Sequence, residues 1–346
     1  MSADSTLQRL WYGRSLGANL LAWLLLPFSA VFALIVGLRR LAYRGGILQT
    51  TQVARPVIVV GNISVGGTGK TPFVIWLVHA LRAKGFNPGV ITRGYRGTST
   101  TWPVVVSTTS DAAIVGDESV LLASRTQTIV VAGPDRVATA QRVIELGADI
   151  VVSDDGLQHY RLHRDVEIAL IDAERGLGNR MLLPAGPLRE RAARLREVDA
   201  VVVHRRNSSS KNTVARFDAA SVTANSKLGD ARSLTTKEQK PLAAFLNQPV
   251  HALAAIGNPE AFFAGLRAAG LTIDTRVLPD HAHIRSLDLT YPDRAPVLMT
   301  EKDAVKCRAV ADARCWAVEL VMNLSVEDSE RIMALIEFAI RDRKLA

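Results

Sequence analysis

Along most of the chain, short apolar runs alternate with stretches in which apolar residues recur at helical spacing. This order begins near residue 50 and continues towards the C-terminus, and it is typical of a largely parallel sheet covered by helices. The pattern predicts strands at 57–60, 90–92, 129–131, 150–152, 166–171, 200–203, 252–256, 297–300 and 316–320, and helices at 72–84, 134–146, 259–269 and about 326–343. We therefore expect an α/β fold.

The N-terminal segment has a different pattern. Leu16–Leu38 contains no ionisable residue, and a helix of its 23 residues could cover a hydrocarbon core of ~30 Å. Trp11 and Tyr12 precede it, as aromatic residues at a membrane interface do. A buried core helix and a cleavable signal peptide are the alternatives, but Arg39 and further arginines follow where a signal peptide has small residues. We expect residues 1–45 to anchor the protein to a membrane, either spanning it or lying in one leaflet.

A glycine-rich loop stands between the first predicted strand and the first predicted helix. It reads V-G-G-T-G-K-T over residues 65–71, in the context of a P-loop. In that motif backbone N–H groups cradle a phosphate, the lysine reaches the β- and γ-phosphates, and the hydroxyl residue holds Mg²⁺. Ser64 stands where the motif usually has its first glycine, and a glycine-rich turn without nucleotide is the alternative. The residues expected to bind nucleotide are Gly66, Gly67, Thr68, Gly69, Lys70 and Thr71.

Two acidic residues, Asp154 and Asp155, follow the strand predicted at 150–152. A P-loop enzyme needs a carboxylate for Mg²⁺ at the end of a neighbouring strand, and hard oxygen ligands suit that ion. A polar strand end that caps a helix is the alternative. No G-x-G-x-x-G sequence follows a predicted strand, so a dinucleotide site has little support.

The net charge indicates the class of partner, and the cysteine content indicates the redox state of the compartment. Lys and Arg total 42 against 33 Asp and Glu, a net charge of +9. This excess points to an anionic partner such as nucleic acid, a membrane surface or a phosphorylated substrate. The two cysteines are too few for a Cys/His zinc cluster or a secreted disulfide framework, so we expect a reducing compartment.

A shift in composition marks a boundary between domains. Ser, Thr, Asn and Lys are frequent between Arg205 and Lys240, as in an interdomain connection or a hairpin. We expect a P-loop nucleotide-binding α/β domain at 46–205, a linker or β-hairpin region at 206–250, and a smaller α/β domain at 251–346.

Several short motifs are weak singly but specific as a set. In chain order they are V-G-G-T-G-K-T-P, R-G-Y, G-D-E, D-D-G-L-Q-H, P-A-G-P-L-R-E, D-H and T-E-K-D-A-V-K. With the N-terminal apolar helix, they resemble the tetraacyldisaccharide 4'-kinase family of the lipid A pathway in Gram-negative bacteria, over nearly the whole chain. The resemblance implies transfer of the γ-phosphate of ATP, with Mg²⁺, to the 4'-hydroxyl of a tetraacyldisaccharide 1-phosphate.

The resemblance also implies an architecture, partners and a location. It implies two three-layer α/β/α domains, joined by a small β linker, with the active site in the cleft between them. The partners would be the lipid disaccharide and the lipid surface of the inner membrane, with the N-terminal helix anchoring the enzyme at the cytoplasmic face. Neither nucleic acid nor an obligate protein partner is expected.

Site roles carry over from the resemblance to the matching positions. Asp117 would deprotonate the sugar hydroxyl together with His281, but this chain reads D-H-A-H where the family often reads D-H-H, so His283 is the alternative histidine. Lys70 and Arg189 would offset charge on the transferred phosphoryl group. The metal ligands would be Thr71, Asp154, Asp155 and Glu118, and the substrate-binding residues would be Arg93, Tyr95, Gln158 and His159.

Two other functions fit parts of the sequence. A membrane-associated P-loop ATPase or GTPase switch would share the P-loop and Asp154, but the N-K-x-D sequence of GTP-specific switches is missing. A non-enzymatic, basic membrane-binding module would share only the net charge and the apolar helix. Acceptor-dependent product formation separates the kinase from both.

Overall fold

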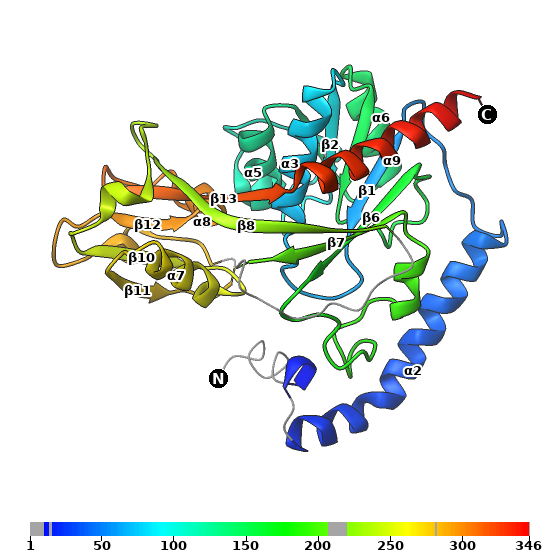
Figure 1. Cartoon of the computed structure of the whole chain (residues 1–346), viewed down its shortest axis with the longest axis horizontal. Helices are drawn as coiled ribbons and strands as arrows, with labels where there is room; N and C mark the ends of the chain where they lie inside the picture. Colours follow the sequence, from blue (N-terminus) through cyan, green and yellow to red (C-terminus); the bar gives the residue numbers. More distant parts are fainter. Residues whose placement is uncertain (1–9, 14–15, 207–219, 281, 346) are drawn as a thin grey trace.

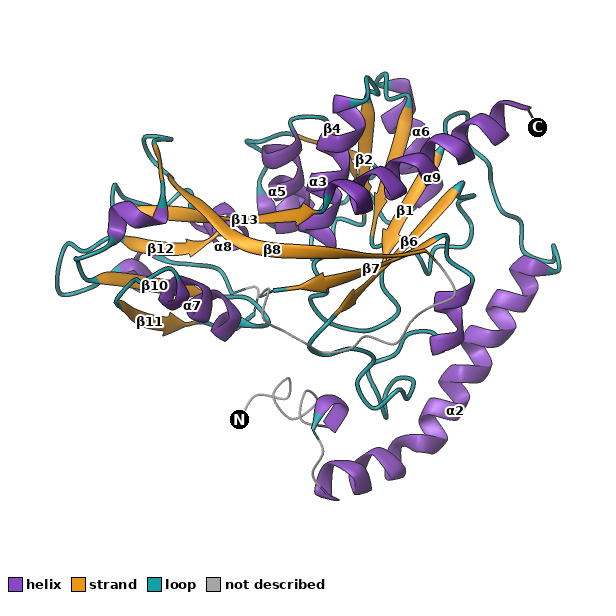
Figure 2. Cartoon of the chain, in the orientation of Figure 1, coloured by secondary structure: helices purple, strands orange, loops and turns teal. Residues whose placement is uncertain are grey.

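The chain folds around one large sheet. The computed structural model describes residues 10–13, 16–206, 220–280 and 282–345. The described residues form a 13-stranded sheet in the order β11-β10-β12-β13-β8-β7-β6-β1-β5-β2-β4-β3, with β9 paired to β8. Helices pack on this sheet, and the long helix α2 (Leu16–Arg44) lies apart from it on one side of the molecule (Figures 1 and 2). The predicted α/β architecture is confirmed.

The first part of the sheet, here called the N-terminal half, is mostly parallel. β7, β6, β1, β5, β2 and β4 run parallel in that order, and β3 is antiparallel to β4. The strands are β1 (Val57–Gly61), β2 (Pro88–Thr92), β3 (Val104–Val106), β4 (Ile129–Ala132), β5 (Ile150–Asp154), β6 (Val166–Asp172) and β7 (Ala200–Arg205). The helices are α3 (Lys70–Ala83), α4 (Ala112–Val115), α5 (Asp117–Thr126), α6 (Arg136–Glu145) and the 3₁₀ helix η1 (Ala192–Arg196).

A long strand, β8 (Ala220–Ser233), joins this half to the rest of the sheet. It pairs in parallel with β7 and antiparallel with β13 (Cys315–Leu324), so the sheet continues unbroken. The C-terminal half contains β9 (Gln239–Lys240), β10 (Val250–Ala254), β11 (Ile273–Val277), β12 (Val297–Thr300), α7 (Pro259–Ala268), α8 (Glu301–Cys307) and the 3₁₀ helices η2 (Leu242–Phe245) and η3 (Ser286–Leu289).

The central strands are apolar at nearly every position because both faces of the sheet are covered. One face carries a core that includes Ile58 and Phe73, and the other carries a core that includes Val59 and Leu157. In the register of β1 and β5, Val60 lies opposite Asp154. The carboxyl ends of these parallel strands therefore meet at one edge of the sheet, where the loops that follow them converge.

The C-terminal helix α9 (Val326–Leu345) packs on the N-terminal half (Figure 1). Its buried residues Ile332, Met333 and Ile336 share a core with Ile58. The amphipathic pattern predicted this helix, but the expected unit at 251–346 placed it with the smaller α/β domain. The packing follows from α9 coming directly after β13, which leads back along the sheet. The boundaries of the domains stay predictions.

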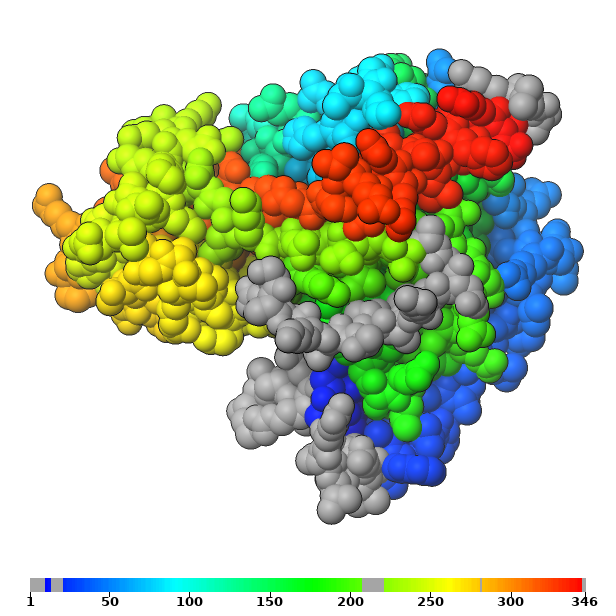
Figure 3. Space-filling view, in the orientation of Figure 1, coloured from blue at the N-terminus to red at the C-terminus, as the bar shows by residue number. Residues whose placement is uncertain are grey.

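Helix α2 (Leu16–Arg44) has two different faces. Ala22 and Ser29 are buried, and Ser29 Oγ donates to the Leu182 carbonyl at 2.9 Å and accepts from the Ala185 N–H at 3.0 Å. The exposed large side chains are Leu21, Trp23, Leu24, Phe28, Val31, Leu34, Ile35, Leu38 and Leu41. Among the described residues, this is the one helix long and apolar enough to cross a membrane. Figure 3 shows it along the outer flank of the molecule, coloured blue.

Candidate active site

The P-loop has the strand–loop–helix geometry that the sequence predicted. It leaves β1 at Gly61 and enters α3 after Gly69, whose φ of +88° favours glycine. A Cβ at Gly69 would lie 2.5 Å from His204 Nδ1, so the position has no room for a side chain. Thr68 Oγ1 is buried and has no hydrogen-bond partner among the described residues. A phosphate oxygen in the loop could accept its hydrogen bond.

Lys70, Asp155 and Arg189 form a chain of ion pairs beside this loop. Lys70 Nζ donates to Asn62 Oδ1 at 3.1 Å and lies 3.5 Å from Asp155 Oδ1. Arg189 Nη1 lies 3.2 Å from both carboxylate oxygens of Asp155. Burial raises the pKa of Asp155, but the cations of Lys70 and Arg189 outweigh burial and hold the pKa below its usual value. Three residues that the sequence analysis assigned separately to the active site therefore lie together.

Asp154 is buried at the end of β5, next to further carboxylates. Its Oδ1 atom has no hydrogen-bond partner among the described residues. Burial raises the pKa of Asp154 to about 7, with contributions from the carboxylates of Glu118 and Asp155, whereas Lys70 lowers it. A cation near these oxygens would remove the repulsion and favour the ionised form.

These residues fit a magnesium site that nucleotide completes. Among the described residues, no three acidic, histidine or cysteine side chains converge closely enough to hold a metal alone. Mg²⁺ commonly takes one or two carboxylates and fills its other positions with phosphate oxygens and water. The unpaired Asp154 Oδ1 and the nearby charges of Glu118 and Asp155 suit such a site. Thr71, the second residue of α3, stands where the motif puts its hydroxyl ligand.

A second acidic pair, Asp117 and Glu118, forms the first turn of α5. Asp117 is buried, and its Oδ1 accepts the Glu118 N–H at 2.9 Å. Lys302 of α8 reaches both residues, with Nζ 3.0 Å from Glu118 Oε1 and 4.0 Å from Asp117 Oδ2. Burial lowers the pKa of Lys302, but the two carboxylates raise it by more. Residues from both halves of the sheet therefore meet at this pair.

Further contacts hold the two halves together near Asp117. Arg125 Nη1 donates to both carboxylate oxygens of Glu301 at 2.7 Å, and Glu301 Oε2 also accepts the Leu320 N–H at 3.1 Å. Arg96 Nη1 donates to the Asp280 carbonyl at 3.4 Å. Asp280 of the C-terminal half therefore lies beside Arg96, which directly follows the R-G-Y motif of the N-terminal half. His281 itself lies outside the described residues, so its role, and the choice between it and His283, stay predictions.

Gln158 lies behind Arg189, between the end of β1 and Glu190. Its Nε2 donates to the Asn62 carbonyl at 3.1 Å and to Glu190 Oε1 at 2.7 Å, while its Oε1 accepts from Arg189 Nη1 at 3.4 Å. Both ends of the amide are thus used within the protein. The Gln158 amide therefore lies against Arg189, and a contact of Gln158 with substrate stays a prediction.

The other predicted substrate residues lie towards solvent or towards helix α2. Tyr95 is half exposed on the loop after β2. His159 lines a cavity near the end of α2, and burial, with the charges of Arg136 and Arg93, lowers its pKa to about 4. The predicted substrate roles of Arg93, Tyr95 and His159 stay predictions.

Sequence reasoning missed two charged residues of the site, Arg136 and Lys302. Arg136 is the fourth residue of G-P-D-R, directly after β4, and its Nη2 donates to the Asp154 carbonyl at 2.8 Å. Lys302 lies in the T-E-K-D-A-V-K motif. The available signal was position: both residues lie shortly after a predicted strand, near the start of the helix that follows, where the side chains of a parallel sheet gather.

Comparisons with known proteins agree with this geometry. The family model of tetraacyldisaccharide-1-P 4'-kinases (LpxK) matches residues 21–339. A protein of Nitrosococcus oceani named tetraacyldisaccharide 4'-kinase is 42% identical over 341 residues, covering 98% of this chain and 97% of its own. A protein of the same name from Aeromonas hydrophila subsp. hydrophila is 45% identical over 322 residues, covering 92% of each chain.

A solved structure matches as well. The crystal structure of LpxK from Aquifex aeolicus, described as an apo form in complex with ATP, superposes with a TM-score of 0.80 and 29% sequence identity. The match covers 92% of this chain and 99% of that one. The motif-based expectation of family is therefore confirmed. The chain belongs to the tetraacyldisaccharide-1-P 4'-kinase family.

Proposed function

We propose that this chain transfers the γ-phosphate of ATP to the 4'-hydroxyl of a tetraacyldisaccharide 1-phosphate in lipid A biosynthesis. One structural observation supports this proposal in addition to family membership. The P-loop cluster of Lys70, Asp155 and Arg189 adjoins Asp154, whose pKa the Glu118 carboxylate also raises, and Glu118 forms with Asp117 a second acidic pair that faces the C-terminal half. A nucleotide switch needs only the first cluster, whereas a kinase also needs a group that accepts the proton of the acceptor. The switch alternative is therefore not favoured.

The phosphate end of ATP would lie in the P-loop. Backbone N–H groups of residues 66–69 would donate to phosphate oxygens, and Lys70 would exchange its contact with Asp155 for the β- and γ-phosphates. Mg²⁺ held by Thr71, Asp154, Asp155 and Glu118 would neutralise charge on these phosphates. Arg189 would offset charge on the transferred group, from a position that Gln158 fixes.

The acceptor alcohol must lose its proton during transfer. Its pKa is too high for ionisation at neutral pH, so a base must accept the proton in the transition state. We assign this role to Asp117 and assign His281 to orienting or relaying the proton. The ammonium of Lys302 lies 4.0 Å from Asp117 Oδ2, and the charge of Asp117 contributes to raising the pKa of that lysine.

Helix α2 would bring this site to a membrane. Its outer face is a continuous apolar surface, while Ala22 and Ser29 dock on the protein. A tetraacylated acceptor lies in a bilayer, so an anchored enzyme meets it in the same plane. The net charge of +9 suits an anionic membrane surface. We place the enzyme at the cytoplasmic face of the bacterial inner membrane, where ATP is available.

Radiolabel transfer from γ-labelled ATP to tetraacyldisaccharide 1-phosphate in detergent micelles with Mg²⁺ tests the proposal. Label should appear in a lipid bis-phosphate with the parent protein and vanish with Lys70→Ala. Arg142→Gln, at an exposed position of α6, serves as the control and should match the parent. Release of label only as free phosphate, at equal rates with and without lipid, would overturn the kinase proposal and favour an ATPase.

A further inference from the structure

Residues 10–12, here called the N-terminal turn, come just before the apolar helix α2 but pack beside the P-loop. Leu10 and Trp11 are buried, and they share a small apolar core with Val65 of that loop. Figure 3 shows the turn in dark blue against the green loop that follows β6. The sequence led us to expect Trp11 at a membrane interface, but its side chain is only 8% exposed because it packs on the protein.

Two hydrogen bonds fix Trp11 to the segment between β6 and η1. Its Nε1 donates to the Pro184 carbonyl at 3.0 Å, and its own carbonyl accepts the Asn179 N–H at 2.9 Å. The same segment returns to the P-loop, where the Val65 N–H donates to the Pro187 carbonyl at 2.8 Å. Trp11 therefore supports a segment that is itself hydrogen-bonded to the P-loop.

Tyr12 reaches the P-loop directly. Its hydroxyl donates to the Val65 carbonyl at 3.4 Å. Burial, which outweighs the charge of Arg175, raises the pKa of Tyr12 above its ordinary value, so the hydroxyl stays protonated at neutral pH. The Arg175 guanidinium lies over the Tyr12 ring, 5.6 Å from its centroid, where the face of the ring attracts a cation. Tyr12 therefore contacts both the P-loop and an arginine beside it.

Arg175 places a positive charge next to the glycines of the P-loop. Its Nη1 lies 3.2 Å from the point that a Cβ of Gly66 would occupy. The Arg175 N–H donates to Asp172 Oδ1 at 3.1 Å, and Asp172 also pairs with Arg206, which donates to the Gly67 carbonyl at 2.9 Å. Guanidinium groups suit phosphate oxygens. The Tyr12 ring is thus the contact that fixes the free end of the Arg175 side chain.

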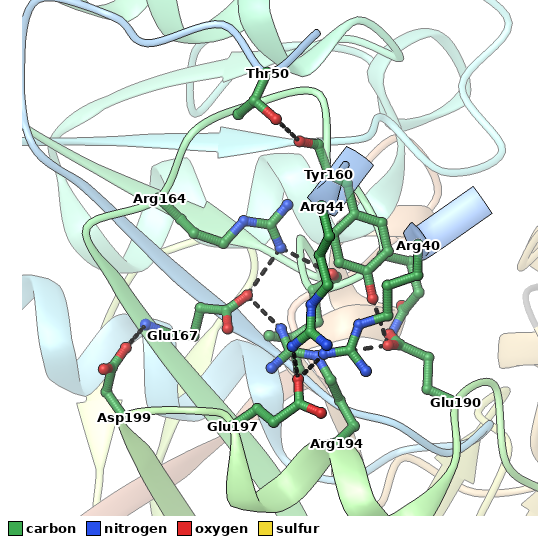
Figure 4. Close-up of polar contacts among 12 residues, drawn as sticks. Arg40, Arg44, Thr50, Tyr160, Arg164, Glu167, Glu190, Arg194, Glu197 and Asp199 are labelled. Atoms are coloured by element: carbon green, nitrogen blue, oxygen red, sulfur yellow. Dashed lines mark hydrogen bonds and ion pairs between the residues drawn. The ribbon is translucent and has the colours of Figure 1, made fainter. Parts of the chain in front are cut away.

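Helix α2, which follows the N-terminal turn, is itself fixed to the protein. Arg44 Nη2 pairs with Glu197 Oε2 at 2.6 Å, and Arg40 binds the same carboxylate. Figure 4 shows Arg40 and Arg44 directed towards Glu197. The middle of the helix is held by the two hydrogen bonds of Ser29. The N-terminal turn therefore adjoins a helix that is docked at its middle and at its end.

We propose that the N-terminal turn positions the P-loop for nucleotide, with Tyr12 as the positioning residue that holds Arg175 and residues 65–66 in place. The inference rests on the proposed function for the identity of the nucleotide. A loop held in its binding conformation loses less conformational entropy when the ligand binds, so the turn raises the affinity for nucleotide. Because the turn leads into α2, one N-terminal region serves both membrane attachment and the nucleotide site.

Equilibrium binding of a fluorescent ATP analogue to the full-length protein in detergent micelles tests the inference. Tyr12→Leu, which stays apolar but lacks the ring and the hydroxyl, should weaken binding about 5- to 10-fold. Tyr12→Phe keeps the ring and should stay within about 2-fold of the parent, because it loses one long hydrogen bond. In steady-state kinetics, Tyr12→Leu should raise the KM for ATP and leave the KM for the lipid acceptor unchanged.

A double-mutant cycle shows whether Tyr12 acts through Arg175. Arg175→Gln should weaken binding of the analogue about 10-fold, the effect of losing a charged group beside phosphate. The double variant with Tyr12→Leu should bind about as weakly as Arg175→Gln alone, because both changes remove the same contact. Full additivity would overturn the inference. Parent-like binding by Arg175→Gln would also overturn it, even if Tyr12→Leu does not fold.

A matched control and a membrane assay complete the test. Tyr291→Leu removes a tyrosine ring that lies 4.2 Å from the Arg276 guanidinium in the C-terminal half, and it should leave binding of the analogue unchanged. Tyr12→Leu should float with vesicles as the parent does. Weaker flotation together with parent-like nucleotide binding would make Tyr12 an interfacial residue and overturn the inference. If the parent binds the analogue but phosphorylates no lipid, the kinase proposal fails, and the binding data still decide the role of Tyr12.

Discussion

Lys302 Nζ lies 3.0 Å from Glu118 Oε1 and 4.0 Å from Asp117 Oδ2, so a lysine of the C-terminal half faces the acidic pair of α5. An ammonium group in this position supplies positive charge that a divalent cation would otherwise bring to Glu118. Nucleotide loading would therefore change the partner of Glu118. If Glu118 binds Mg²⁺ as proposed, Lys302 would couple metal binding to the contact between the halves.

Lys302→Met should change the response to Mg²⁺. Removing a competing ammonium should lower the half-saturating Mg²⁺ concentration about 3- to 10-fold, while turnover falls because Asp117 loses a nearby cation. A Mg²⁺ titration of initial rates at saturating ATP measures both effects. Lys302→Arg keeps the charge and should stay near the parent. An unchanged Mg²⁺ requirement in Lys302→Met would remove Glu118 from the metal site.

Asp117→Asn should separate chemistry from nucleotide binding. Loss of a general base typically lowers turnover about 10²- to 10⁴-fold, while Asp117 lies outside the P-loop cluster, so the KM for ATP should change little. Lys70→Ala should weaken both turnover and ATP binding. Steady-state rates and equilibrium binding of a fluorescent ATP analogue distinguish the two variants. Parent-like turnover in Asp117→Asn would exclude this carboxyl from the mechanism.

His204 should make the protein less stable in mild acid. Burial and the charge of Arg206 lower its folded pKa to about 4 from 6.5. As the pH falls, His204 is therefore protonated in the unfolded chain before it is protonated in the folded protein. The free energy of unfolding is fully retained above about pH 6.5, and the contribution of His204 is lost between about pH 6.5 and 4. At pH 5 the loss should be about 2 kcal/mol.

Denaturant unfolding at pH 7.5 and pH 5 measures the contribution of His204. His204→Gln has no titrating ring and retains an amide for the Ser226 Oγ contact, which is 2.8 Å long in the parent. The loss of stability between the two pH values should be smaller in this variant by about 2 kcal/mol. Equal losses in both proteins would contradict the buried, neutral state of His204.

The outer face of α2 should bind lipid without contributing to folding. Leu24, Phe28 and Leu34 are each more than 60% exposed, so changing all three to serine should keep the free energy of unfolding within about 0.5 kcal/mol per site. Flotation with vesicles should show a large loss of membrane binding. Leu287→Ser, at an exposed apolar residue of η3, should have no effect. Unchanged flotation of the triple variant would show that another surface anchors the protein.

Much of the P-loop side of the site could be predicted from sequence because it depends on local order. A strand, a glycine-rich turn and a helix fix the position of Lys70, and the carboxyl end of a neighbouring parallel strand fixes Asp155. The loop motif that carries Arg189 pointed to the same cluster, through family resemblance. The alternation of short apolar runs with stretches of helical spacing likewise predicted most strands, because strands buried on both faces are continuously apolar.

The contacts between the halves could not be predicted in the same way. Lys302 meets Glu118 across 184 positions of sequence, and no periodicity encodes that distance. G-D-E was also compatible with a solvated turn, whereas Asp117 and Glu118 begin a helix. β8 was predicted only as one alternative, a linker or β-hairpin region at 206–250, because its residues, rich in Ser, Asn, Lys and Asp, lack the apolar run of a central strand. Its stability comes from the pairing with β7 and β13.

The pairing of β8 with both β7 and β13 has a consequence for fragments of this protein. Either half expressed alone would expose a long unpaired strand edge, which favours aggregation. We therefore expect that neither half folds as an independent domain when it is moved into another protein. Two fragments cut in the segment between β7 and β8 should instead reassociate when coexpressed, because each supplies the hydrogen-bonding edge that the other lacks.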